Sequence, residues 1–162
     1  MKTLLLIRHA HAGHGEPGLP DRARTLSTRG QQEALALGRR LADRHLRPTL
    51  VVTSPALRTA ETARAVARAL GYRLEDIVPN ERLYECRADE LLDTIAAFND
   101  RHSVAIVVGH NPALSELAWR FSEAIEFMAP ASVATVEFDT DEWIALLHER
   151  PVGASLDAGE PG

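Results

Sequence analysis

Three short aliphatic runs, each followed by a polar segment, restrict the fold of this chain more than any other feature. They predict buried strands over residues 2–8, 50–54 and 103–108, because apolar runs of this length are typical of strands and helices are usually longer. Each run is followed, after a loop, by a stretch with helical periodicity. Segments that alternate in this way favour a mostly parallel sheet with helices on both faces. We therefore expect an α/β fold, a three-layer α/β/α sandwich.

The expected helices cover residues 27–46, 55–70, 88–100 and a segment that opens at residue 111. Ser54 precedes a proline, which predicts that Ser54 is the N-cap of the second helix. Thr28 and Gln31 have the spacing of a capping box at the start of the first. These start signals place the polar segments between the strands and the helices.

The C-terminal part of the chain predicts two further strands and a tail. Residues 131–139 and 142–148 are rich in β-branched and aromatic residues and are expected to form a hairpin or adjacent edge strands. From Pro151 onward the chain is rich in glycine, proline and alanine, a composition typical of disorder. We expect a single domain over residues 1–150 and a disordered tail over residues 151–162.

Net charge restricts the partners of this chain, and its cysteine content indicates its redox compartment. The formal net charge is −5, which argues against nucleic acid and anionic membranes because both need clustered positive charge. Cys86 is the only cysteine, so no intrachain disulfide can form and a reducing compartment is expected. No apolar run approaches the roughly 20 residues of a membrane span. We expect a soluble cytoplasmic protein with no nucleic-acid or membrane partner.

The loops after the three predicted strands carry the candidate functional residues. Parallel strands end at one edge of a sheet, so residues 8–14, 54–58 and 109–111 are expected to converge there. Arg8 and Arg58 can clamp a phosphoryl group from two sides, because guanidinium groups stay charged and donate paired hydrogen bonds. His9 adds a nucleophilic nitrogen, and nearby guanidinium charges favour its neutral form. The expected site therefore binds anions and can attack phosphorus.

Two other interpretations fit the same segments. His9, His11 and His14 lie within six residues, a density of imidazoles that can also hold zinc or another transition metal. A metallohydrolase is therefore one alternative. A non-catalytic module that binds a phosphorylated partner is the other, and a complete set of nucleophile, acid and clamp would argue against it.

Four motifs resemble those of the histidine phosphatase superfamily, which has the phosphoglycerate-mutase-like fold. They are RHA at 8–10, RTLSTRG at 24–30, SPALRTAET at 54–62 and GHNP at 109–112. The similarity spans residues 1–148, and its closest branch is that of the SixA-like phosphohistidine phosphatases. The resemblance implies that His9 is the phosphate-accepting nucleophile, that Arg8 and Arg58 bind phosphate, and that His110 is a second active-site histidine. It also implies that no metal or other cofactor is required.

The resemblance also bears on the general acid and on the substrate. Glu85 resembles the family position that protonates the leaving group, and Asp21 is the reserve candidate. Arg24, Asp21, Ser54 and Asn111 are further candidates for substrate binding. Ala10 stands where the family commonly has glycine, so the loop must accommodate a β-carbon.

Little length is spare between the core elements, which implies an open active site. An open site suits a phosphoryl group displayed on another protein. The expected function is a metal-independent phosphatase acting through a phosphohistidine intermediate, with protein phosphohistidine as substrate and small phosphate esters as the alternative.

Overall fold

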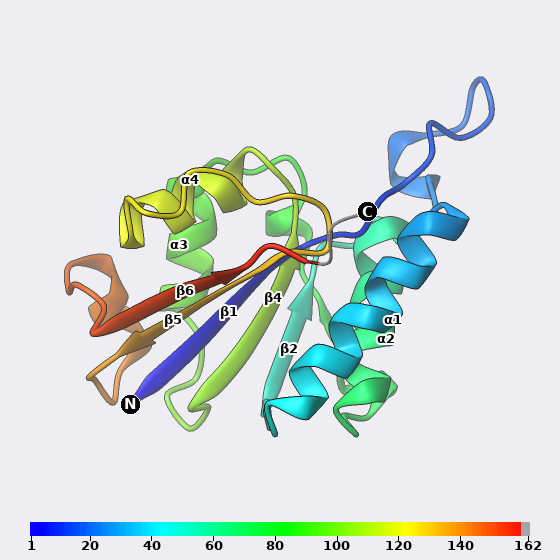
Figure 1. Ribbon diagram of the computed structural model, residues 1–162. Coiled ribbons are helices and arrows are strands. Elements are labelled where there is room, and N and C mark those ends of the chain that lie inside the picture. The colour runs from blue at the N-terminus through cyan, green and yellow to red at the C-terminus, as the bar shows by residue number, and fades with distance from the viewer. Residues whose placement is uncertain (160–162) are drawn as a thin grey trace.

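A six-stranded sheet runs through the middle of the protein (Figure 1). In sheet order the strands are β3-β2-β4-β1-β5-β6, and the first four are parallel to one another. β5 runs antiparallel to both β1 and β6. The computed structural model describes residues 1–159. The strands are β1 (Lys2–Arg8), β2 (Leu50–Thr53), β3 (Val78–Pro79), β4 (Val104–Gly109), β5 (Val133–Phe138) and β6 (Gly153–Asp157).

Four α-helices cover the two faces of the sheet. α1 and α2 lie on one face, and α3 and α4 lie on the other (Figure 1). This arrangement confirms the three-layer α/β/α sandwich. The α-helices are α1 (Thr28–Asp43), α2 (Leu57–Ala69), α3 (Ala88–Ala96) and α4 (Ala113–Phe121), and short 3-10 helices cover Asp21–Ala23, Leu74–Asp76, Glu81–Leu83 and Trp143–Leu147.

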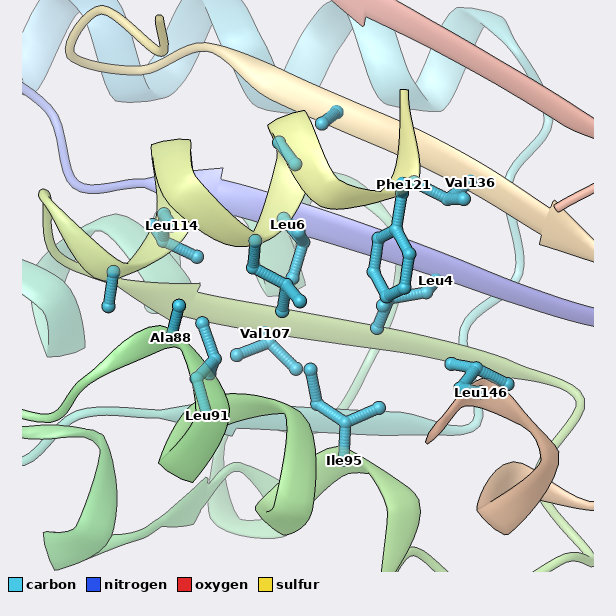
Figure 2. Packing of buried hydrophobic residues seen from close by; sticks show 14 of the residues in the cluster. Leu4, Leu6, Ala88, Leu91, Ile95, Val107, Leu114, Phe121, Val136 and Leu146 are labelled. Atoms are coloured by element: carbon cyan, nitrogen blue, oxygen red, sulfur yellow. The ribbon is translucent and has the colours of Figure 1, made fainter. Parts of the chain in front are cut away.

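β1 is buried on both faces, as its aliphatic sequence predicts. Leu4 and Leu6 pack into the cluster beneath α3 and α4, which also contains Leu114 and Leu91 (Figure 2). Leu5 and Ile7 point to the opposite face and pack against α1 and α2. Successive side chains of a strand point to opposite faces, so four consecutive aliphatic residues supply both cores. The carboxyl end of β1 is held in place from both sides.

The sheet order brings three loops together at one edge. β4 lies between β1 and β2, with Arg8 opposite Gly109 and Thr53 opposite Val108. The segments that follow these strands therefore leave the sheet side by side. The predicted convergence of residues 8–14, 54–58 and 109–111 is confirmed.

The helix starts differ from those expected. Ser27, and not Thr28, is the N-cap of α1, and its hydroxyl accepts a hydrogen bond of 3.0 Å from the amide of Gly30. α2 begins at Leu57 with Ala56 as its N-cap, so the prediction that Ser54 caps this helix is wrong. The Ser54 hydroxyl instead forms a hydrogen bond of 2.8 Å with Nε2 of His110, in the loop after β4.

Two predictions about the C-terminal part are wrong. Residues 143–147 form a 3-10 helix and no strand, because buried Trp143 and Leu146 close the end of the core beside α3. The segment after Pro151 is ordered, since β6 pairs with β5 and Asp157 accepts a 2.9 Å hydrogen bond from Arg40 Nε. Backbone hydrogen bonds to β5 stabilise this segment, although its glycine-rich sequence has few apolar side chains to bury. The last part of the predicted tail, residues 160–162, lies outside the described residues.

None of the helices in residues 1–159 combines the length and the hydrophobicity that crossing a bilayer requires.

The first turn of α1 packs directly on the backbone of the loop that follows β1. A β-carbon at Gly30 would lie 1.8 Å from the carbonyl oxygen of His11, with no flexible side chain to move aside. Glycine is required here for this close approach, in addition to any part in starting the helix.

We predict that Gly30→Ala destabilises the protein by about 1–3 kcal/mol, the usual cost of forcing extra volume into a packed site. Urea unfolding followed by circular dichroism measures the change. Gln32→Ala, an exposed position two residues along α1, is the matched control and should change stability by less than about 0.5 kcal/mol. Equal stability of Gly30→Ala and the wild type would contradict this account.

Candidate active site

His9 lies immediately beyond β1, and its ring nitrogens have different roles. Nδ1 lies 2.7 Å from the carbonyl oxygen of Ala10. Because a carbonyl oxygen only accepts, Nδ1 carries the proton and Nε2 has the lone pair. The His9 amide donates to the Gly109 carbonyl at 3.2 Å, which fixes the backbone to β4's end. The ring is therefore oriented with Nε2 available to act as a nucleophile.

Ala10 is accommodated in the position where the family commonly has glycine. It is fully buried in the cluster beneath α1 and α2, and its amide donates a 3.1 Å hydrogen bond to Thr62 Oγ1 on α2. The β-carbon is thus part of the core, and the loop keeps the His9 carbonyl and amide paired with neighbouring backbone.

Burial and positive charge keep His9 neutral. Desolvation lowers the pKa of His9 to about 4, and the charges of Arg58, Arg8 and Arg24 act in the same direction. The hydrogen bond to Ala10 opposes this shift without overcoming it. At neutral pH the imidazole has the unprotonated nitrogen that nucleophilic attack needs.

Arg8 ends β1 beside His9 and retains unused hydrogen-bonding capacity. Its Nη1 donates to the Met128 carbonyl at 3.0 Å, and its guanidinium carbon lies 5.6 Å from the centre of the Phe127 ring. Its Nε is buried and has no hydrogen-bond partner within residues 1–159. Burial lowers the pKa of Arg8 from its ordinary value. A half-buried guanidinium with a free donor is suited to binding an anion.

Arg58, in the first turn of α2, is held by Asp21. Arg58 is 7% exposed. Its Nη1 donates to the Asp21 carbonyl oxygen at 2.9 Å, and its Nη2 donates to the Asp21 carboxylate at 3.0 Å. The carboxylate also accepts from Arg24 Nη1 at 2.9 Å and from the Tyr84 hydroxyl. Asp21 thus links three elements around the guanidinium of Arg58.

The hydrogen bond from Tyr84 holds the pKa of Asp21 well below its usual range, and the bonds from Arg58 and Arg24 add to this effect. Asp21 is therefore ionised at neutral pH. An ionised carboxylate has no proton to deliver, so Asp21 in this arrangement is an anchor for Arg58.

His110, in the loop after β4, faces His9. The two ring centres lie 5.4 Å apart at an interplanar angle of 61°. Nε2 of His110 lies 2.8 Å from Ser54 Oγ, and Nδ1 lies 3.5 Å from Arg58 Nη2. Desolvation and the charge of Arg58 lower the pKa of His110 to about 3. Ser54 is fully buried, so its hydroxyl orients a neutral imidazole at the edge of the site.

The remaining candidate residues divide into those at the site and those that support it. Asn111 supports the backbone: its Nδ2 donates to the Met128 carbonyl at 2.9 Å and its Oδ1 accepts from Ser115 Oγ at 2.8 Å. Arg24 donates from Nε to the Gly13 carbonyl at 2.9 Å in addition to its bond with Asp21. The Nδ2 and Oδ1 atoms of the Asn111 side chain thus both form hydrogen bonds within the protein. Arg24 fixes the loop that carries Asp21.

Glu85 directly follows Tyr84 in the chain. It is exposed and has a positive backbone φ of 55°. Its neighbour Tyr84 contacts the ring of His110 edge-on, with ring centres 5.7 Å apart. Glu85 is therefore next to a residue that touches the site, in the segment between the 3-10 helix Glu81–Leu83 and α3.

Tyr84 is a site residue that the sequence did not indicate. The only indication in the sequence was its position directly before Glu85, the candidate general acid. Its contacts are with Asp21 and His110, 63 and 26 positions away in the sequence, and no local pattern reports such pairs.

The three clustered histidines do not form a metal site with one another. His9 Nδ1 faces the Ala10 carbonyl, and His11 Nδ1 lies 2.7 Å from Ser27 Oγ. Across residues 1–159, no group of three or more histidine, cysteine, aspartate or glutamate side chains is arranged to hold a metal ion.

The family model of the histidine phosphatase superfamily (branch 1) matches residues 4–91, just over half of the chain. The protein therefore belongs to the histidine phosphatase superfamily. The matched segment contains most of β1 and all of α1, β2 and α2, and with them Arg8, His9 and Arg58.

Solved structures of SixA proteins share the fold. The SixA protein of Agrobacterium tumefaciens is 28% identical with a TM-score of 0.78, over 85% of this chain and 92% of that one. The SixA protein of Nakamurella multipartitia is 26% identical with a TM-score of 0.77, over 99% and 95%. The protein histidine phosphatase SixA in complex with tungstate reaches a TM-score of 0.78 at 19% identity, over 97% and 95%. The phosphoglycerate-mutase-like fold is confirmed.

Two proteins are similar to this chain in sequence. A 2,3-bisphosphoglycerate-dependent phosphoglycerate mutase of Chelativorans sp. is 34% identical over 95 residues, which are 51% of this chain and 43% of the mutase. The match therefore spans less than half of that enzyme. A chloroplastic protein of Arabidopsis thaliana is 25% identical over 150 residues, 88% of this chain and 69% of its own length.

The low pKa values of the two site histidines predict acid-sensitive stability. In the unfolded chain a histidine takes up a proton near pH 6.5, whereas folded His9 and His110 take one up only at about pH 4 and about pH 3. Between these values the unfolded state binds more protons, so the free energy of unfolding falls as pH falls from 7 towards 4. The slope approaches about 1.4 kcal/mol per pH unit for each histidine.

Urea unfolding at pH 7, 6 and 5 measures this slope. We predict that His110→Gln reduces it, while replacement of the exposed His148 by glutamine leaves it unchanged. An unaltered slope in His110→Gln would show that burial of this histidine does not cause the acid sensitivity.

Proposed function

We propose that this protein is a phosphatase that acts through a phosphohistidine intermediate on His9, and that its substrate is a phosphorylated histidine in another protein. The observation that carries the proposal is a neutral histidine that has its unprotonated Nε2 free for attack and lies near enough to Arg8 and Arg58 for their charges to lower its pKa. One of the structurally similar proteins is a protein histidine phosphatase that was solved with tungstate, an oxyanion that resembles phosphate.

In the first step, the lone pair of His9 Nε2 attacks phosphorus. A nitrogen–phosphorus bond forms, the bond from phosphorus to the leaving group breaks, and its electron pair stays on the leaving group. Arg8 and Arg58 stabilise the equatorial phosphoryl oxygens, since positive charge placed in advance is the main source of catalysis in phosphoryl transfer. The Nδ1–H held by the Ala10 carbonyl takes part of the positive charge that develops on the ring.

In the second step, water attacks phosphorus and the bond to His9 breaks, which returns the electron pair to Nε2 and releases inorganic phosphate. His110 is proposed to contribute a hydrogen bond to the phosphoryl group from Nε2–H, because its Nδ1 accepts from Arg58 Nη2, a group that only donates. Before the phosphoryl group binds, Nε2–H donates to Ser54 Oγ at 2.8 Å, and a phosphoryl oxygen would replace this hydroxyl as the acceptor.

Glu85 is the proposed acid for the leaving group and the base for the attacking water. Asp21 is unsuited to the first role because its pKa is held well below the usual range by Tyr84 and the arginines. The exposed position of Glu85 beside Tyr84 supports the choice, since an exposed carboxyl can approach the leaving group without competing for the arginines.

A labelled intermediate is the first expected result. With phosphoramidate as donor, excess chelator present and an alkaline quench, intact mass spectrometry should show a transient gain of one phosphoryl group, mapped to His9. His9→Ala should show no gain and lose turnover by at least about 10³-fold, because no other nitrogen occupies this position. Turnover by His9→Ala close to that of the wild type would refute the mechanism, and binding of phosphate without turnover would favour a non-catalytic module.

The need for Glu85 should depend on the leaving group. General acid catalysis contributes about 10²–10⁴ in rate, and imidazole leaves more readily than an alkoxide. We therefore expect Glu85→Gln to slow hydrolysis of an alkyl phosphate at least about tenfold more than hydrolysis of phosphohistidine. Parallel measurements of kcat on both substrates test this, with Glu81→Gln as a control carboxylate that pairs with Arg22. Equal losses on the two substrates would argue against the assignment of Glu85.

A further inference from the structure

A hollow with two exposed aromatic side chains adjoins the active site. Trp119 on α4 is 49% exposed and Phe127 in the following loop is 61% exposed. They line one hollow of about 580 Å³, whose walls also include Pro112, Glu116, Arg120 and Glu126. We name it the α4 groove. Large aromatic side chains exposed together on a protein surface usually mark a site of interaction.

The α4 groove is continuous with the phosphate-binding residues. The Phe127 ring that lines it lies against the guanidinium of Arg8, 5.6 Å from ring centre to carbon. Arg8 Nη1 and Asn111 Nδ2 donate to the same carbonyl, that of Met128, at 3.0 and 2.9 Å. Asn111 lines the groove and directly follows His110. The groove therefore adjoins Arg8 through Phe127 and Asn111.

The walls of the α4 groove select the chemistry of its occupant. Trp119 and Phe127 supply an apolar interior, while Glu116 and Glu126 outnumber Arg120 among the charged residues. Within the described part of the chain neither glutamate forms a salt bridge. An acidic metabolite would be repelled by the two carboxylates, whereas an apolar side chain beside a lysine or arginine would find complementary partners for both groups.

The volume supports a polypeptide as the occupant. Cavities of about 300–1,000 Å³ hold ligands of drug size, which corresponds to several side chains and exceeds what a small phosphate ester requires. Aromatic residues are also the residues that contribute most to binding energy in protein interfaces.

From these observations we infer that the α4 groove binds the polypeptide that carries the phosphorylated histidine, through an apolar side chain with a basic neighbour. The inference rests on the proposed phosphatase function and adds the recognition chemistry of its substrate. Catalysis on the phosphoryl group and recognition of the carrier then use adjacent but separate residues.

Two synthetic peptides test the inference. Each contains one histidine, phosphorylated with phosphoramidate. The first has leucine and lysine residues beside the histidine, and the second has serine and glutamate in the same places. We expect kcat/KM of the wild type to be at least about tenfold higher for the first peptide, a difference of about 1.4 kcal/mol.

Trp119→Ala should remove most of this preference and change the hydrolysis of free phosphoramidate by less than about twofold. Glu116→Lys leaves the aromatic rings in place and should lower kcat/KM for the lysine peptide while raising it for the glutamate peptide. Leu35→Ala is the matched control, because Leu35 is an apolar residue of 51% exposure that lines a different hollow between α1 and α2. Thermal unfolding of each variant verifies that it is folded.

The outcomes separate the two proposals. If the wild type hydrolyses phosphoramidate but does not distinguish the peptides, or if Trp119→Ala slows phosphoramidate as much as peptide, the inference about the groove is wrong and the phosphatase function stands. If Trp119→Ala slows a small aryl phosphate as strongly as the leucine peptide, the groove receives small aromatic leaving groups and the polypeptide is excluded. If phosphoramidate is not hydrolysed at all, the proposed function itself fails.

Discussion

The burial of β1 on both of its faces is the constraint on which the other features depend. Leu4 and Leu6 supply one core and Leu5 and Ile7 the other, so the strand has no face left for solvent. Because its neighbours β4 and β5 pair with it along its whole length, its carboxyl end has one fixed position. Arg8 and His9 follow at that end, and their placement is a consequence of core packing and not of contacts within the loop alone.

The electrostatics of the site follow from this placement. Burial lowers the pKa values of His9 and His110 so that both imidazoles are neutral at pH 7, and the charges of the surrounding guanidinium groups act in the same direction. Asp21 supplies the compensating negative charge through hydrogen bonds to Arg58, Arg24 and Tyr84. Such a set of oriented charges needs little rearrangement when an anion arrives, which is the condition under which electrostatic stabilisation is most effective.

The sequence predicted the parts of this structure that depend on local pattern. Aliphatic runs identified β1, β2 and β4, and the rule that parallel strands end at one edge predicted that Arg8, Arg58 and His110 lie together. Predictions that required long-range information were wrong: Ser54 bonds to His110 and does not cap α2, Trp143 lies in a 3-10 helix that seals the core, and the glycine-rich segment after Pro151 contains β6. In each case a partner more than ten residues away determines the conformation. The anchoring of Arg58 by Asp21 and Tyr84 could not be read from spacing for the same reason.

The position of β4 has a consequence for how the protein is made. In the sheet β4 lies between β1 and β2, yet it is synthesised after both. His9 and Arg58 emerge from the ribosome early, but the strand that spaces them arrives only with residues 104–109. Contacts between distant segments form slowly because chain closure costs entropy. A nascent chain that stops before β4 therefore carries His9 and Arg58 without the strand that lies between β1 and β2, and the contacts of Arg8 and His9 with Met128 and Ala131 can form only later still.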